Sequence, residues 1–315
     1  GATNYTCILF LNRKQNETIA YVDASRGVIE GGISIDARSI PLDGGGWMFN
    51  SDKESVLLDK LLHGDWLRLK DIRERAFQGL RTSDNDVYVV SADGPPKAGL
   101  FTVQSKATGK THKIEVGLLK PLLSGDEIRA FSLTHSGQWI IFPYDISGPR
   151  PELFSEKSLK SEFPHGWKYL KQCEPRLRAR ERDRMDKPNW WAYVYPKNLD
   201  LFEQPKIMLR DYNDKASAAV DEKGRYYSIT AYCLTLKHDS PIDLETLCAL
   251  LNTKLVFWYL GKIGTSLQRG FVRFMPQYLD KVPIPPLPPK LRKGSLDADV
   301  CAAFGIEPDA LEGLK

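Results

Sequence analysis

Five histidines are the residues best suited by type to act as general bases, and they are widely separated along the chain. A serine or cysteine nucleophile needs such a base beside it, and none of the five lies near a supporting motif such as Gly-x-Ser-x-Gly. Each is therefore interpreted as a surface or turn residue. The five are His63, His112, His135, His165 and His238.

Residue spacings typical of metal sites are also missing from the sequence. It contains no His-Glu-x-x-His, no calcium-binding loop and no Cys-x-x-Cys pair, and its five cysteines are dispersed. We therefore predict no catalytic residue, no metal site and no disulfide framework.

Two short motifs have a structural interpretation that outweighs a chemical one. The glycine triplet 44–46 lacks the Gly-x-Gly-x-x-Gly pattern of a dinucleotide loop, so it is interpreted as a flexible turn. Asp-Glu-Lys-Gly at 221–224 is superficially similar to a nuclease motif, but between two predicted strands it indicates a turn.

Basic residues concentrate between Lys168 and Arg184, where seven positive charges accompany three negative ones. This local excess equals the formal net charge of +4 of the whole chain. Contact with a DNA backbone and a solvated helix with internal ion pairs explain the pattern equally well. If residues 176–185 form one helix, its basic side chains make two opposite stripes: Arg176, Arg180 and Arg184 on one, Arg178 and Arg182 on the other.

Aromatic residues cluster at 190–195 and could stack on unpaired bases. Their alternation also fits a strand with Trp191, Tyr193 and Tyr195 on one face and Trp190 on the other. Packing within the core is the favoured interpretation.

These side chains need elements to position them, and hydrophobic spacing predicts both strands and helices. A capping box of Ser51 and Glu54 begins a helix, a helical stretch from 155 to 185 is interrupted by Pro164 and Pro175, and Asp243 begins another helix. Two short helices hinged at Gly305 end the chain. The predicted strands are 4–13, 17–24, a hairpin over 97–116, 139–145, 205–211 and 225–237.

This order predicts an α+β fold. We expect a mixed or antiparallel, β-rich recognition domain with a long helical insertion and C-terminal helices. Hydrophobic residues make up 42% of the chain and charged residues 27%, as in soluble globular proteins. The sequence shows no signal peptide or membrane span, so a cytoplasmic location is expected.

An ordered set of segments resembles the C-terminal half of adenine-N6 DNA methyltransferases, especially type IIG restriction-modification enzymes with a TaqI-like specificity domain. The most specific segments are the tryptophan-rich stretch 189–211 and the segment LCALLNTKLVFWYLGKIG at 247–264. They follow GLRTSDNDVYVV, LLKPLLSGDEIRAF, WIIFPYD and GWKYLKQCEPRLRARERD, and they precede LDKVPIP.

The resemblance implies a division of the chain and of its function. Residues 1–50 are similar to the last strands of a methyltransferase domain, 51–290 would form the DNA target-recognition domain with halves at 51–150 and 151–290, and 291–315 would be a helical tail. The family's Asn/Asp-Pro-Pro-Tyr/Phe loop is absent, and the chain contains no Asn-Pro. We therefore expect a truncated fragment or excised domain, with S-adenosylmethionine bound by the missing methyltransferase domain.

The resemblance also implies that the chain holds double-stranded DNA and reads base edges through the major groove, while the missing domain receives an extruded adenine. Candidate contacts are loop residues able to pair with bases or phosphates, and unexceptional surface turns are the alternative for each of them. Arg178 and Arg182, or the opposite stripe, would grip phosphates. The candidates are Arg81, Thr82, Ser83, Asn85, Arg178, Arg182, Arg210, Asn213, Lys215, Gln268, Arg269 and Arg273.

Two further hypotheses belong to other functional classes. The chain could retain nuclease or methylase activity, which a cofactor-binding assay would decide. It could also be a protein-interaction module, such as a specificity subunit that assembles with separate catalytic chains, which predicts an apolar patch on its first strands.

Overall fold

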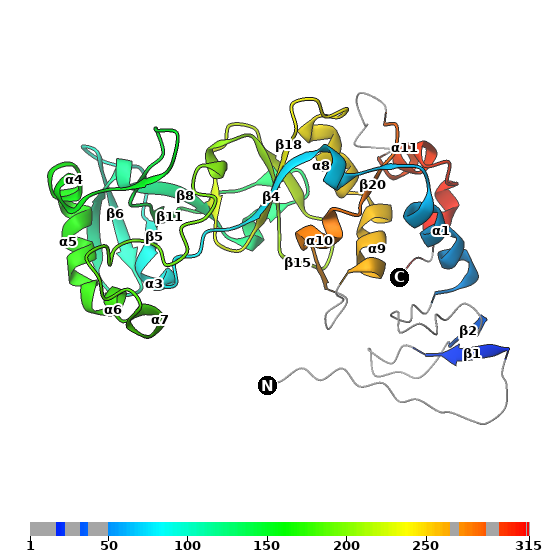
Figure 1. Cartoon of the computed structure of the whole chain (residues 1–315), viewed down its shortest axis with the longest axis horizontal. Coiled ribbons are helices and arrows are strands. Elements are labelled where there is room, and N and C mark those ends of the chain that lie inside the picture. Colours follow the sequence, from blue (N-terminus) through cyan, green and yellow to red (C-terminus); the bar gives the residue numbers. More distant parts are fainter. Residues whose placement is uncertain are drawn as a thin grey trace. The chain divides into compact units, whose positions relative to one another are not determined.

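The computed structural model describes residues 17–22, 32–36, 50–264, 271–287, 296–312 and 314 (Figure 1). The chain divides into two compact units, 1–64 and 65–315. In the first unit, β1 (Thr18–Tyr21) pairs antiparallel with β2 (Ile33–Asp36), which confirms a strand within 17–24. The predicted strand 4–13 and the glycine triplet 44–46 lie outside the described residues.

Helix α1 (Asp52–His63) begins with the predicted capping box. The Ser51 hydroxyl accepts from the Glu54 amide at 3.4 Å, and the Ser51 amide donates to the Glu54 carboxylate at 2.9 Å. Each residue thus satisfies a backbone or side-chain group that the helix start would leave unpaired.

The second unit contains two main sheets. The larger has the order β17-β8-β11-β5-β6-β7, and every pairing is antiparallel except that of β17 with β8. The predicted hairpin is confirmed as β6 and β7. The strands of this larger sheet are β5 (Val89–Ala92), β6 (Leu100–Ser105), β7 (Thr111–Glu115), β8 (Leu119–Leu123), β11 (Gln138–Ile141) and β17 (Tyr227–Ser228).

The smaller sheet is antiparallel throughout, with the order β16-β14-β18-β4. The prediction of one long strand at 225–237 was wrong, because the segment divides between the two sheets. Ser228 makes the break: its hydroxyl donates to the Leu123 carbonyl and accepts from the Thr230 and Ala231 amides. The strands are β4 (Arg73–Gln78), β14 (Lys206–Leu209), β16 (Ala218–Asp221) and β18 (Tyr232–Leu236).

Two segments pass side by side from one sheet to the other. The Gly79 amide donates to the Ala231 carbonyl at 2.9 Å, and the Leu80 amide donates to the Ser228 carbonyl at 2.8 Å. A Cβ atom at position 79 would lie 2.6 Å from the Ser228 carbonyl oxygen and from the Ile229 carbonyl carbon. This close approach of two backbones requires glycine.

The predicted helical insertion consists of four short helices, with α5 packed on β7. Pro164 and Pro175 lie in the first turns of α5 and α6, where their missing N–H groups leave no hydrogen bond unmade, as the sequence predicted. The prediction of one helix over 176–185 was wrong. The four helices of the insertion are α4 (Glu156–Glu162), α5 (Pro164–Gln172), α6 (Glu174–Arg178) and α7 (Arg180–Asp183).

The helix predicted from Asp243 is two helices, α8 (Leu244–Leu251) and α9 (Lys254–Ile263). Thr253 breaks it, because its hydroxyl accepts from the Val256 amide and begins a second helix. At the C-terminus, α11 (Leu296–Ala303) and a 3₁₀ turn (Pro308–Leu311) confirm the predicted pair, with Gly305 between them at φ 62°.

Smaller elements complete the second unit. The two-stranded pairs are β3 (Leu67–Arg68) with β20 (Pro283–Ile284), β9 (Ile128–Arg129) with β10 (Ser132–Leu133), β12 (Tyr144–Asp145) with β13 (Glu152–Leu153), and β15 (Tyr212–Asn213) with β19 (Val272–Arg273). The short helices are α2 (Leu69–Ile72), α3 (Asn85–Tyr88) and α10 (Pro276–Leu279), with 3₁₀ turns at Val116–Leu118, Gly125–Glu127 and Leu201–Glu203.

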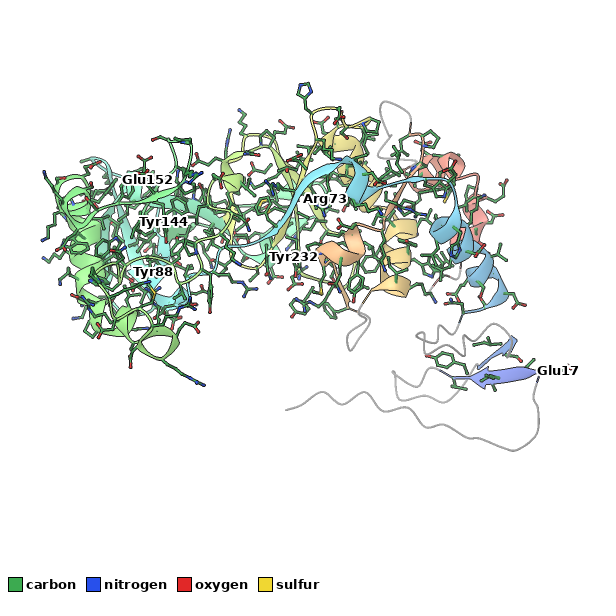
Figure 2. The ribbon with its side chains drawn as sticks, viewed as in Figure 1. Glu17, Arg73, Tyr88, Tyr144, Glu152 and Tyr232 are labelled. Atoms are coloured by element: carbon green, nitrogen blue, oxygen red, sulfur yellow. The ribbon has the colours of Figure 1, made fainter. Side chains whose placement is uncertain are left out.

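The tryptophan-rich segment is a turn, so the strand predicted there was wrong. Its predicted place in the core is confirmed except for Tyr195, which is 38% exposed. Trp190, Trp191 and Tyr193 are all buried. Tyr193 packs edge-on against Tyr88, and both belong to the large core beside the six-stranded sheet, where Figure 2 labels Tyr88 and Tyr144.

The predicted α+β class, with a helical insertion and C-terminal helices, is confirmed. No helix in the described residues is long and apolar enough to cross a membrane.

Candidate nucleic-acid interface

Arg180 joins three separate segments of the second unit. Its guanidinium is buried and donates to four backbone carbonyls: Leu177 at 2.8 Å, Thr82 at 2.8 Å, Trp190 at 2.6 Å and Ala192 at 2.9 Å. A buried charge is tolerated where hydrogen bonds replace its hydration, and these four carbonyl dipoles do so. The end of α6, the loop before α3 and the tryptophan-rich segment are therefore fixed together.

The chain directly after Arg180 makes a left-handed turn. Glu181, Arg182 and Asp183 have φ values of 52°, 57° and 65°, a conformation that costs roughly 1–2 kcal/mol for each non-glycine residue. Met185, 1% exposed, ends the turn in the core. This turn is the physical reason why the predicted helix and its two stripes do not form.

The predicted Thr82–Asn85 loop lies against this turn. The Ser83 hydroxyl donates to the Glu181 carboxylate at 3.0 Å, and Ser83 itself has φ 60°. Thr82 is 1% exposed and donates to the exposed Asn85 side chain at 2.8 Å. Thr82 thus shapes the loop from inside, and Ser83 and Asn85 lie at its surface.

Several basic residues of the helical insertion are engaged in ion pairs, among them two arginines. Arg176 pairs with Asp84 at 2.6 Å and with Asp86 at 2.9 Å, and these hydrogen bonds raise its pKa. Arg178 pairs with Glu174 at 2.8 Å and with Asp186 at 3.0 Å. These contacts fasten the helical insertion, so Arg178 is less available for a phosphate than the sequence suggested.

Other basic side chains lie exposed beside aromatic rings. Arg184 lies over the ring of Tyr195, 5.6 Å from its centroid, and Tyr195 forms a backbone bridge with Arg81. The Arg81 guanidinium donates to Gln78 at 2.6 Å. Arg182 is exposed and has no hydrogen bond or ion pair with any described residue.

The 210–215 loop continues this surface on the smaller sheet. Arg273 donates to both carboxylate oxygens of Asp211, at 3.0 and 2.8 Å, and lies 4.8 Å from the ring centroid of the exposed Tyr212. Tyr232, labelled in Figure 2, is close enough to Arg81 of the first region and to Arg273 of the second for both charges to act on it. Its pKa is raised by burial, and the charges of Asp211, Arg273 and Arg81 all act on its hydroxyl.

The remaining predicted contacts divide between the loop interior and its surface. Asn213 is 1% exposed and donates to the Arg210 carbonyl at 2.8 Å, so it holds the loop. Arg210 pairs with Asp126 at 3.0 Å, and Lys215 is exposed. Gln268 and Arg269 lie outside the described residues.

We call this set the basic-aromatic strip; its residues are exposed except for the half-buried Arg273, whose side chain is 26% exposed. It combines planar guanidinium groups, which match phosphates and base edges, with aromatic rings on which bases or sugars can pack. Sequence reasoning missed Tyr212, named Arg184 only within the alternative stripe, and assigned Tyr195 to the core. The strip consists of Arg81, Arg182, Arg184, Tyr195, Tyr212 and Arg273.

Groups that could suggest catalysis have structural roles. Lys206 and Asp221 form a buried ion pair at 2.6 Å, and Asp221 also accepts from the amides of Arg225 and Tyr226. This pair holds the 221–224 turn, with Gly224 at φ 58°, which confirms the turn interpretation. Among the described residues, no cluster of three or more histidine, cysteine or acidic side chains could hold a metal ion.

The fold is that of a two-sheet α+β domain, and the strip places basic and aromatic side chains on its surface. The family model of the TaqI-like C-terminal specificity domain matches residues 120–284, just over half of the chain, and the chain belongs to this family. It is also similar to three type II methyltransferases. M.XhoI of Xanthomonas vasicola is 25% identical over 201 residues, M.PaeR7I of Pseudomonas aeruginosa 23% over 263, and M.BanIII of Aneurinibacillus aneurinilyticus 22% over 251.

These matches cover 62%, 81% and 76% of this chain in the same order. They cover 35%, 41% and 39% of the methyltransferases, so the chain corresponds to well under half of each relative's length.

Proposed function

We propose that this chain recognises the target sequence in double-stranded DNA for a restriction-modification adenine-N6 methyltransferase. The observation that carries the proposal is the basic-aromatic strip, which lies on the helical insertion, the Arg81–Tyr195 bridge and the β15–β19 pair of a TaqI-like specificity domain. Arg184 and Arg81 would contact phosphates and set the position of the duplex, and neighbouring side chains would read base edges in the major groove.

The methyl transfer itself belongs to a separate methyltransferase domain in this proposal, either in the same polypeptide or in a partner chain. The relatives' printed names, all type II methyltransferases, support such a partnership. S-adenosylmethionine would be held by that domain. The described part of this chain contains no glycine-rich loop between a strand and a helix that would fit the cofactor. In the type IIG arrangement, the same recognition would also direct cleavage.

The test is selection from a library of random duplexes by the purified chain. The proposal predicts a short enriched motif and binding that weakens steeply with salt. Salt-dependent binding without a motif would reduce the chain to a non-specific DNA grip, and no binding of duplex DNA at low salt would contradict the proposal.

A further inference from the structure

The left-handed turn 181–183 differs in net charge from the arginines of the strip that would contact phosphates. Glu181 and Asp183 flank Arg182, so the three residues together carry a formal charge of −1. An element that served to bind phosphates would be expected to carry net positive charge. Arg182 is nevertheless exposed, and its guanidinium is free of any partner in the described residues.

The backbone that carries Arg182 is held on both sides. On the N-terminal side, Arg180 fixes the chain through four carbonyls, and on the C-terminal side the buried Met185 anchors it. The Ser83 hydroxyl donates to the Glu181 carboxylate at 3.0 Å and thereby occupies one of the two acidic groups adjacent to Arg182 in the chain. Strained backbone of this kind persists only where the surroundings fix it, and it concentrates at functional sites.

A fixed position matters differently for the two kinds of DNA contact. A phosphate attracts any nearby cation and tolerates displacement, whereas a base is distinguished only by a donor pair in the correct place. The usual partner of an exposed arginine fork in the major groove is guanine, whose O6 and N7 accept two parallel hydrogen bonds.

We propose that Arg182 reads a guanine in the recognised sequence, presented by the left-handed turn. This inference rests on the proposed function and deepens it, because it separates a base-reading residue from the phosphate contacts of Arg184 and Arg81. Glu181 acts as a positioning residue: its bond to Ser83 keeps its carboxylate away from Arg182.

The experiment is selection from random duplexes with the wild-type chain and the variants Arg182→Ala, Arg182→Lys and Arg184→Ala. Arg182→Ala is expected to lose the preference for guanine at one position by about tenfold or more, with the other positions unchanged. Lysine keeps the charge but cannot make two parallel bonds, so Arg182→Lys should lose that preference too. Arg184→Ala should weaken binding to all duplexes and leave the motif intact.

Each failure has its own signature. If the wild-type chain selects no motif, both the proposed function and this inference fail. If the wild-type motif appears and Arg182→Ala leaves it unchanged, or Arg182→Lys restores it fully, the inference is wrong while the proposed function stands.

Discussion

The Arg180 guanidinium donates a 2.8 Å hydrogen bond to the carbonyl oxygen of Thr82, 98 residues earlier in the chain. The same side chain donates to the carbonyls of Trp190 and Ala192. Because Arg180 directly precedes the turn that carries Arg182, its buried charge joins this turn to the loop before α3 and to the tryptophan-rich segment. The arginine-rich segment is thus divided by function: some arginines build the domain and others lie on its surface.

Replacing Arg180 by methionine tests this structural role. The change leaves three buried carbonyls and one partly buried carbonyl without their donor, and we expect the free energy of unfolding to fall by roughly 3 kcal/mol or more. The matched control is Arg182→Met, which removes an exposed side chain and should change stability by less than about 0.5 kcal/mol. Urea unfolding of both variants measures the difference, and equal losses would contradict the role given to Arg180.

The left-handed conformation of Asp183 predicts that a substitution at this position raises the stability of the chain. Glycine adopts φ 65° without the steric cost of a Cβ atom, so Asp183→Gly should stabilise the chain by about 0.5–1 kcal/mol. Asp200, at φ −82°, is the control, and Asp200→Gly should destabilise it by a similar amount. Thermal unfolding would count against the turn geometry if both variants were less stable than the wild type.

The close approach at Gly79 can be probed with one methyl group. Gly79→Ala places a Cβ atom against the backbone of Ser228 and Ile229, and it should lower the free energy of unfolding by about 1–3 kcal/mol. At Gly148 the nearest atom would lie 3.8 Å away, so Gly148→Ala should be nearly neutral. Comparable stability of the two variants would show that the segments between the sheets do not approach as described.

Alkaline pH should unfold the domain through its buried tyrosines. Burial raises the pKa of Tyr88, Tyr144, Tyr193 and Tyr227 above the ordinary value of about 10. The folded state therefore holds these protons more tightly than the unfolded state. Their contribution to stability is complete below pH 10 and declines as pH rises through the raised values. Loss of far-UV circular dichroism above about pH 10 should be accompanied by a rise in tyrosinate absorbance that corresponds to these four phenols, whereas their ionisation in a folded chain would refute the prediction.

Local signals in the sequence predicted much of the fold because they act over a few residues. The capping box at Ser51, the hairpin β6–β7, the prolines at helix starts and the hinge at Gly305 all depend on near neighbours. The errors arose where distant contacts decide the structure. The helical pattern of the sequence continues past Arg180, but the helix ends there because the Arg180 guanidinium donates to the carbonyls of Thr82 and Trp190 in other segments. Ser228 divides a strand because it bonds to Leu123, 105 residues earlier.

The candidate site follows the same division. Residue type and turn position correctly placed Arg81, Ser83, Asn85 and Lys215 at the surface, but Thr82 and Asn213 are buried beneath their own loops. The ion pairs of Arg176 could not be predicted, because Asp84 and Asp86 lie 92 and 90 residues earlier and reach it through the fold. The DNA-binding role of every candidate stays a prediction.

The most direct test of the central claim is the salt dependence of duplex binding, measured by fluorescence anisotropy for three forms of the chain. The strip variant Arg81→Ala/Arg184→Ala removes two charges from the strip, and the control Lys223→Ala/Arg225→Ala removes two from the turn at the opposite end of the β14–β16 pair. If the strip holds DNA, the slope of log K against log salt should become shallower by about two in the strip variant and stay at the wild-type value in the control. Equal slopes for the two variants, or binding independent of salt, would contradict the claim.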